Sequence, residues 1–151
     1  MNTEGEFNAF ITKEIRMLGQ EYKAIKLSDR FRIGLPDWIM IHKGRTIAVE
    51  AKFVKKTPTK GRLLNHPITA PQLSSLKSMA LAGCGCWGLI ANGETRRMAA
   101  VALTGIPETG NFSCDLFTNE MNRYVFLFDF TQTNNMLRTM FAVHTLISDN
   151  P

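Results

Sequence analysis

Residues 34–53 of the 151-residue chain read GLPDWIMIHKGRTIAVEAKF and predict a β-hairpin. The segment 38–41 (WIMI) is rich in the β-branched and aromatic side chains that strands favour, and the HKGR that follows supplies a polar turn containing glycine. In the second strand, 46–53, successive side chains point to opposite faces of the sheet. Apolar side chains therefore share one face, whereas Glu50 and Lys52 lie together on the other.

Hydrophobic spacing predicts further helices and strands on both sides of this hairpin. Apolar residues recur at helical spacing before and after it, and turn-forming residues separate short runs rich in strand formers. The expected elements are helices over 5–18, 70–82 and 133–147, a short strand within 20–35, strands at 87–91, 98–103 and 125–130, and loops over 54–68 and 105–122. This order predicts a single α/β domain, spanning residues 1–151, with a central mixed β-sheet flanked by helices.

The composition excludes several classes of protein. Apolar residues make up 44% of the chain and charged residues 21%, so the chain can bury one core without disulfides. Its three cysteines are odd in number and have no histidine nearby at zinc-ligand spacing, which favours a reducing, cytoplasmic compartment. No apolar run approaches the ~18 residues that cross a bilayer, and the acidic, polar start MNTEGEFNAF is unlike a secretory signal. We therefore expect a cytoplasmic protein without a membrane partner.

Positive charge is concentrated in the first part of the chain. Residues 1–62 hold 13 Lys and Arg against 7 Asp and Glu, a net charge of +6, whereas residues 63–151 have a net charge of −1. The densest run of basic residues contains no acid and consists of Lys52, Lys55, Lys56, Lys60 and Arg62. Such a cluster attracts polyanions with an affinity that falls as salt rises. A solvated loop that only keeps the protein soluble is the alternative, and charge alone does not decide between the two.

Three ionisable residues of the hairpin are predicted to converge. Asp37 opens the first strand, and a hairpin folds the start of its first strand back beside the end of its second, where Glu50 and Lys52 lie. Glu50 sits in an otherwise apolar strand, where a charge is costly unless a metal or an ion partner satisfies it. A Glu/Lys pair on a solvated strand and an acid before a strand are also common in proteins without catalytic sites, so the spacing alone leaves that alternative open.

These residue types suit metal-assisted hydrolysis of phosphodiester bonds. Asp37 and Glu50 supply two anionic oxygens and the Ala51 carbonyl a third, and Mg²⁺ is a hard ion that prefers oxygen ligands; Mn²⁺ is an expected substitute. The ion would neutralise phosphate charge and lower the pKa of a bound water. Lys52 would orient that water or stabilise charge in the transition state.

The motif residues resemble a known group of enzymes. Pro36-Asp37 followed by Glu50-Ala51-Lys52, in this strand context, resembles the PD-(D/E)xK nuclease superfamily. With Gly34-Leu35 in front and Ile68-Thr69-Ala70-Pro71-Gln72 behind, the chain is similar to VRR-NUC domains and to small Holliday-junction resolvases of the kind that phages carry. The resemblance covers about residues 5–103, and we expect 104–151 to complete the fold with a strand and a helix.

The resemblance implies a restriction-endonuclease-like fold and an Mg²⁺-dependent DNA endonuclease. It also implies a homodimer that cuts branched DNA, acting in the host cytoplasm if a phage encodes it. A junction resolvase is the favoured member of this class. A VRR-NUC-type nicking or general DNA nuclease and a DNA-binding module that keeps the fold without cutting are the alternatives.

The resemblance also implies two further site residues. Nucleases of this kind carry a Glu on the first helix that joins the metal site; Glu6 lies near the helix start, where the family pattern has it, and Glu14 lies among inward-facing apolar positions. Glu6 is favoured and Glu14 stays open. Gln72 is implied to point at the active site, although Thr69 and Gln72 also have the spacing of a helix capping box. The residues expected to contact DNA phosphates are Lys55, Lys56, Lys60 and Arg62.

Overall fold

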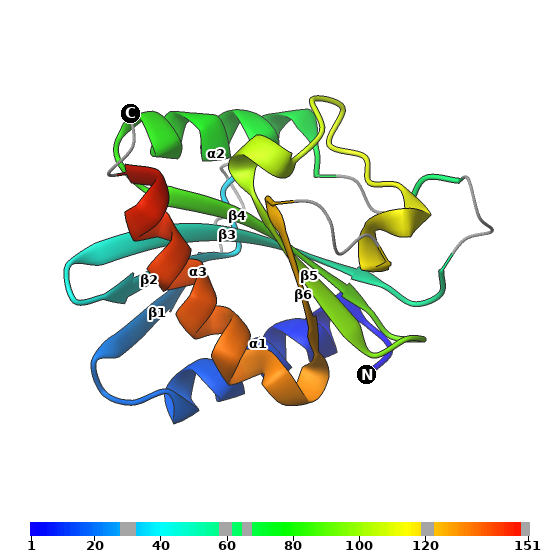
Figure 1. The fold of residues 1–151 in the computed structure, drawn as a ribbon, viewed down its shortest axis with the longest axis horizontal. Coiled ribbons are helices and arrows are strands. Elements are labelled where there is room, and N and C mark those ends of the chain that lie inside the picture. The colour runs from blue at the N-terminus through cyan, green and yellow to red at the C-terminus, as the bar shows by residue number, and fades with distance from the viewer. Residues whose placement is uncertain (28–32, 58–61, 65–67, 119–122, 149–151) are drawn as a thin grey trace.

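A six-stranded β-sheet with helices on both faces forms the centre of the structure, which is a computed structural model (Figure 1). The structure describes residues 1–27, 33–57, 62–64, 68–118 and 123–148, the last five by their backbone. The α/β fold with a mixed sheet flanked by helices, predicted from the sequence, is confirmed. None of the helices in these described ranges has the length and apolarity needed to cross a membrane.

The helices and strands follow the predicted order closely. The elements are α1 (Glu4–Met17), β1 (Tyr22–Lys26), β2 (Trp38–His42), β3 (Arg45–Val54), α2 (Ala70–Leu81), β4 (Gly85–Asn92), β5 (Arg97–Ala102), β6 (Val125–Asp129) and α3 (Thr133–Ser148). Short 3₁₀ turns lie at η1 (Leu103–Gly105), η2 (Cys114–Phe117) and η3 (Phe130–Gln132), two of them within or at the edge of the segment predicted to be a loop.

The sheet has the strand order β1-β2-β3-β4-β5-β6, so each strand pairs with its neighbours in the chain. All pairs are antiparallel except β3 and β4, which are parallel and are joined by α2 on one face of the sheet. Parallel neighbours need such a crossover connection, and a helix is its usual form. The N-terminus of α2 therefore follows the end of β3, the strand that carries Glu50 and Lys52.

The β2–β3 hairpin turns on two residues with left-handed backbone. Lys43 has a φ of 47° and Gly44 a φ of 75°, as a two-residue turn of type I′ requires. The turn sets the register in which Trp38 pairs with Val49, which brings the residue before β2 level with the middle of β3.

Two hydrophobic clusters cover the two faces of the sheet. The helices α1 and α3 pack on one face around Trp38 and Trp87, each 1% exposed, and α2 packs on the other with the segment 103–117. In β3 the apolar side chains Ile47, Val49, Ala51 and Phe53 face α1 and α3. The opposite face, which carries Glu50 and Lys52, is turned toward α2, so the N-terminal turn of α2 can reach these two polar side chains.

Candidate active site

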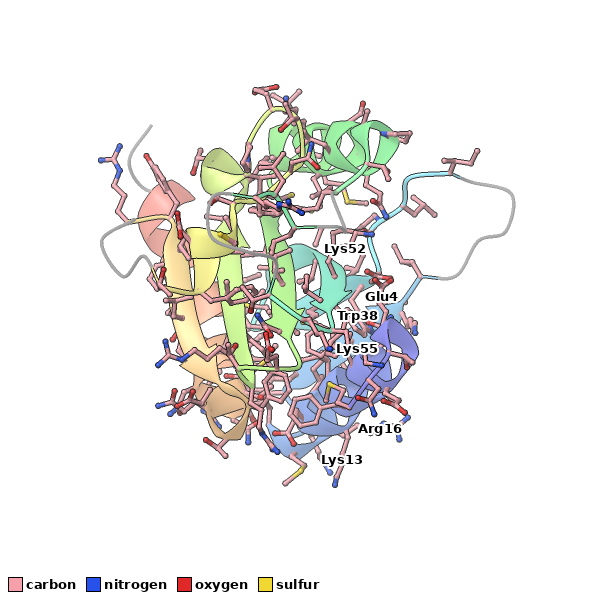
Figure 2. The ribbon with its side chains drawn as sticks, turned by 90° about the vertical axis from the view of Figure 1, so that its right-hand side faces the viewer. Glu4, Lys13, Arg16, Trp38, Lys52 and Lys55 are labelled. Atoms are coloured by element: carbon pink, nitrogen blue, oxygen red, sulfur yellow. The ribbon has the colours of Figure 1, made fainter. Side chains whose placement is uncertain are left out.

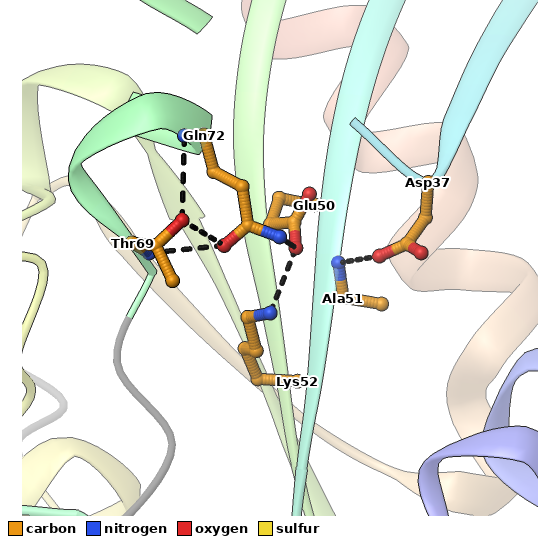
Figure 3. Close-up of polar contacts among 6 residues, drawn as sticks. All are labelled: Asp37, Glu50, Ala51, Lys52, Thr69 and Gln72. Carbon is orange, nitrogen blue, oxygen red and sulfur yellow. Dashed lines mark hydrogen bonds and ion pairs between the residues drawn. The ribbon is translucent and has the colours of Figure 1, made fainter. Parts of the chain in front are cut away.

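The hairpin brings Asp37 beside the centre of β3. Because Trp38 pairs with Val49, Asp37 lies one step further along, level with Glu50 and Ala51. Its Oδ2 accepts a hydrogen bond of 2.8 Å from the Ala51 N–H (Figure 3). This bond holds one carboxylate oxygen against the strand and orients the Asp37 side chain.

Gly34 docks the loop before Asp37 against the start of α2. Its φ is 95°, a conformation that favours glycine, and a Cβ atom built on it would lie 2.7 Å from the backbone carbonyl of Pro71. Any larger residue would push the two segments apart. The close approach joins two stretches that carry the nuclease resemblance, one leading to Asp37 and the other to Gln72.

Glu50 is the most buried charged group of the site, with 1% of its surface exposed. Its Oε1 accepts hydrogen bonds from Lys52 Nζ, at 2.9 Å, and from Gln72 Nε2. Its Oε2 is buried and has no hydrogen-bond partner among the described residues. A buried carboxylate oxygen is costly unless a donor group or a cation pairs with it, which makes Glu50 Oε2 a candidate metal ligand.

The surroundings of Glu50 disfavour its charge. The pKa of Glu50 is raised from its ordinary value to about 7; burial is the largest cause, the nearby Asp37 carboxylate also raises the pKa, and Lys52 opposes the change. Such a group is close to half ionised near neutral pH, and a positive charge placed at the site would favour the carboxylate form. A pKa perturbed by burial and by a second carboxylate is typical of functional sites.

Besides Glu6, which the sequence favours as the helix glutamate of the site, and Glu14, which it leaves open, α1 carries Glu4. Glu4 is half-buried in the first turn of α1, and its negative charge adds to the rise in the pKa of Glu50. Glu6 is exposed, and its carboxylate accepts a hydrogen bond from the Asn2 N–H, which lowers the pKa of Glu6. Glu14 lines a pocket further along α1. Glu4 and Glu6 share the first turn of α1, and the choice of Glu6 over Glu14 as the site glutamate stays a prediction.

Gln72 makes both of the contacts that its position allowed. It closes a capping box at the start of α2, in which the Thr69 N–H donates to Gln72 Oε1 at 2.9 Å and the Gln72 N–H donates to Thr69 Oγ1 at 3.5 Å. The same side chain donates from Nε2 to Glu50 Oε1. The capping bonds orient the amide so that its NH₂ group points at the carboxylate (Figure 3).

The donor set fits a hard divalent cation. Glu50 Oε2 and the Asp37 carboxylate are oxygen ligands of the kind that Mg²⁺ prefers, and the first of them lacks a partner among the described residues. In the described part of the chain, no group of three or more His, Cys, Asp and Glu side chains has the arrangement of a metal site. An ion held by two carboxylates would keep several water ligands, as Mg²⁺ usually does.

The residues predicted to contact DNA phosphates are exposed wherever the structure describes them. Lys55, Lys56 and Arg62 are exposed, and Lys60 lies outside the described residues. Lys52 belongs to the same basic run but is only 12% exposed and pairs with Glu50, so it is part of the site rather than of the surface. Figure 2 shows Lys52, Lys55 and Glu4 on one side of the molecule. The exposed Lys55 therefore lies on the same side as Lys52 of the site.

Hydrogen bonds of Asn92 connect the segment after β3 to the β4–β5 turn. Asn92 is fully buried and donates from Nδ2 to Thr57 Oγ1 at 2.6 Å, while its Oδ1 accepts from the N–H groups of Glu94 and Thr95 at 3.0 and 3.1 Å. The Thr57 N–H donates in turn to Glu94 Oε2 at 2.9 Å. This network holds the segment 55–57, and with it two exposed lysines, in a fixed position.

We expect the replacement Asn92→Ala to destabilise the protein by about 2–3 kcal/mol, because it removes three hydrogen bonds to a buried side chain. Thr57→Val removes one of them and is expected to cost about 1 kcal/mol. Urea unfolding measures both. Thr139→Val is the matched control, since its hydroxyl bonds only to the exposed backbone of α3 and its removal should cost less than about 0.5 kcal/mol. Equal destabilisation by Thr57→Val and Thr139→Val would contradict the network.

The likeness of this chain to known proteins lies in its structure rather than in its sequence. No family model and no curated protein matches the sequence. Among solved structures, the chain is similar to Hjc, a Holliday junction resolvase from the archaeal hyperthermophile Archaeoglobus fulgidus, with 14% sequence identity and a TM-score of 0.42. The match covers 93% of this chain and 89% of that chain. It concerns the arrangement of helices and strands, and the chemistry of the site follows from the contacts described above.

Proposed function

We propose that this protein is an Mg²⁺-dependent DNA endonuclease that hydrolyses phosphodiester bonds in branched DNA, most simply as a Holliday-junction resolvase. The observation that carries the proposal is the buried Glu50, which has one oxygen unpaired among the described residues, a second carboxylate from Asp37 beside it and an ammonium group from Lys52 at 2.9 Å. Two acidic oxygens and one amine, gathered beside an exposed basic segment, fit a phosphodiester better than a neutral substrate.

Each residue of the site has a definite task in this proposal. Asp37 and Glu50, with the Ala51 carbonyl, would hold the cation, which when bound supplies positive charge to the phosphate and acidifies a water ligand. Lys52 is held at its place by Glu50 and would stabilise negative charge that develops on the phosphate oxygens. Gln72 keeps the Glu50 carboxylate oriented through its hydrogen bond to Oε1.

The choice of branched DNA and of a homodimer rests on the resemblance of the motif residues to small resolvases. Cleavage of a panel of end-labelled substrates tests it directly: a four-way junction, a flap, a plain duplex and a single strand, each with Mg²⁺, with Mn²⁺ and with EDTA. The proposal expects metal-dependent cuts that are fastest on the junction. Equal cutting of all four substrates would indicate a general nuclease, and junction binding without cleavage under either metal would indicate a binding module.

The exposed cations near the site are expected to set the salt dependence of DNA binding. Replacing Lys55, Lys56 and Arg62 together by Ala should weaken junction binding and reduce the slope of log Kd against log salt by about 2–3, because each cation that no longer pairs with a phosphate lowers the slope by roughly one. Fluorescence anisotropy at several salt concentrations measures the slope.

The matched control for this charge prediction is the pair Lys23→Ala and Arg45→Ala. Both residues are exposed and lie near the β2–β3 turn, at the opposite end of β3 from Lys55. Removing them should leave the slope nearly unchanged. A slope that falls equally in the control would mean that charge at any position has the same effect, and the basic segment would then have no special part in DNA binding.

A further inference from the structure

A pocket of about 450 Å³ lies on the α1 side of the sheet, next to the end of β3, and has no part in the chemistry described above. It opens between α1, the β4–β5 turn and η3, and its lining residues are Met1, Phe10, Glu14, Gly93, Arg96, Phe130 and Thr131. A volume of this size suits a ligand as large as a nucleoside. The lining combines aromatic rings with one acidic and one basic side chain.

The pocket adjoins the strand that carries the site. The Gly93 N–H donates to the Val54 carbonyl at 2.9 Å, and a Cβ atom on Gly93 would lie 2.7 Å from Phe53 Cζ and 3.5 Å from the Lys55 carbonyl. The end of β3 therefore lies directly behind the pocket wall that Gly93 forms. This end of the strand is only a few residues beyond Lys52. DNA that passes the end of β3 would reach both features.

Exposed cations of α1 and of the segment after β3 lie on the side of the molecule that carries Lys52. Figure 2 shows Lys13 and Arg16 of α1 and Lys55 on the side that also carries Glu4 and Lys52. All three of these outer cations are exposed. A phosphodiester chain can follow such cations while one of its bases turns toward the protein.

The apolar wall of the pocket is a rigid pair of rings. Phe10 and Phe130 lie with ring centroids 5.9 Å apart and planes tilted by 34°, and both are half-buried against the core. The Phe130 N–H donates to the Arg96 carbonyl at 3.1 Å, which fixes η3 to the turn. Partly exposed aromatic rings held in place in this way are a stacking surface for a flat ring, and base–aromatic stacking is a main source of affinity for unpaired nucleotides.

The polar groups of the pocket indicate which ring it would take. Glu14 is half-buried, and no ion pair among the described residues joins it to Arg96 on the other wall. A carboxylate is an acceptor of two parallel hydrogen bonds. Guanine offers two neighbouring donors, at N1 and at its exocyclic amine, whereas the other bases place an acceptor beside each Watson–Crick donor.

We propose that this pocket receives an unpaired guanine of the DNA substrate, with the ring against Phe10 and Phe130 and the Watson–Crick edge on Glu14. The inference rests on the proposed function, because it assigns the pocket a part of the same DNA. It gives Glu14 a task that the sequence alone could not assign, since Glu14 was there an alternative ligand for the metal. Arg96 at the rim would pair with the phosphate of the extruded nucleotide.

Binding to duplexes that carry one extrahelical nucleotide tests the pocket without cleavage. The protein, in EDTA, is titrated into fluorescent duplexes whose extra position is guanine, inosine, thymine or an abasic sugar. The guanine duplex should bind about tenfold more tightly than the abasic one. Inosine lacks the exocyclic amine and should fall between them. Equal affinity for the guanine and abasic duplexes would overturn the proposal.

Variants separate recognition of the base from general DNA binding. Glu14→Gln should reduce the ratio of guanine to abasic affinity to about twofold, because one of the two acceptors is removed. Phe130→Leu should lower binding of every duplex with a base at the extra position. Glu21→Gln, which changes an exposed acid at the start of β1, should change none of these ratios. Thermal unfolding of each variant confirms that it is folded.

Three outcomes keep this proposal distinct from the proposed function. If neither the unmodified protein nor any variant prefers the guanine duplex, while Mg²⁺-dependent junction cleavage is intact, the guanine-binding proposal alone is overturned. If Glu14→Gln instead abolished cleavage of a junction with no extra base, Glu14 would belong to the metal site and the pocket assignment would be wrong. A guanine preference retained by a protein that cuts nothing would support the pocket and overturn the nuclease.

Discussion

Asp37→Asn is expected to lower Mg²⁺-dependent cleavage by about 10²–10³-fold while junction affinity in EDTA changes by less than about threefold. Asparagine keeps the size of the side chain and retains an oxygen for the Ala51 N–H, so the hairpin geometry should persist. The substitution removes one negative charge beside Glu50 and one anionic ligand for the cation. Initial rates on a labelled junction, measured over a range of Mg²⁺ concentrations, give the size of the effect.

The control for this variant is Glu108→Gln. Glu108 is an exposed acid on the α2 face of the molecule, and its ion pair with Lys77 lies at the surface, so its removal changes net charge equally and leaves the site untouched. Its cleavage rate should stay within about twofold of the unmodified protein. An Asp37→Asn protein that cuts at the unmodified rate would contradict the proposed function, and one that no longer binds in EDTA would show that Asp37 serves the fold instead.

The metal-free protein should lose stability as pH rises, by about 3 kcal/mol from Glu50 alone. Its pKa is raised from 4.5 in the unfolded chain to about 7 in the fold. Below pH 4.5 both states hold the proton and the full stability is present. Between 4.5 and 7 the unfolded state releases the proton first, so stability falls by up to about 1.4 kcal/mol for each pH unit, and it levels off above 7.

Comparison with Glu50→Gln isolates this contribution from every other titrating group. The free energy of unfolding of both proteins is measured by urea unfolding in EDTA at about pH 5 and about pH 8. Between the lower and the higher pH, the unmodified protein should lose about 3 kcal/mol of stability relative to the glutamine variant. Excess Mg²⁺ at the higher pH should restore stability to the unmodified protein and not to the variant, because the cation binds the ionised carboxylate in the fold. A difference that does not change with pH would mean that Glu50 stays ionised in the fold.

The sequence by itself determined the elements and the hairpin part of the site. The period of two along β3 placed Glu50 and Lys52 on one face, and the return of the chain at Lys43-Gly44 brought Asp37 level with them. These relations depend on strand geometry and on one short turn, so they can be read from residues close in the chain. The predicted capping spacing of Thr69 and Gln72 is local in the same way.

Only the tertiary structure decided which distant side chains complete the site. Glu6 and Glu14 remain the predicted alternatives for the helix glutamate, while the fold brings the charge of Glu4 near enough to raise the pKa of Glu50 and places Glu14 in the lining of a pocket. Gln72 reaches Glu50 because α2 packs on that face of the sheet. Helical spacing shows which side of a helix is apolar, but the rotation and sliding of that helix on the sheet result from many packing contacts at once. Glu4 and Glu6 are two residues apart and so lie on different sides of α1, and the pattern does not specify which side turns toward Glu50.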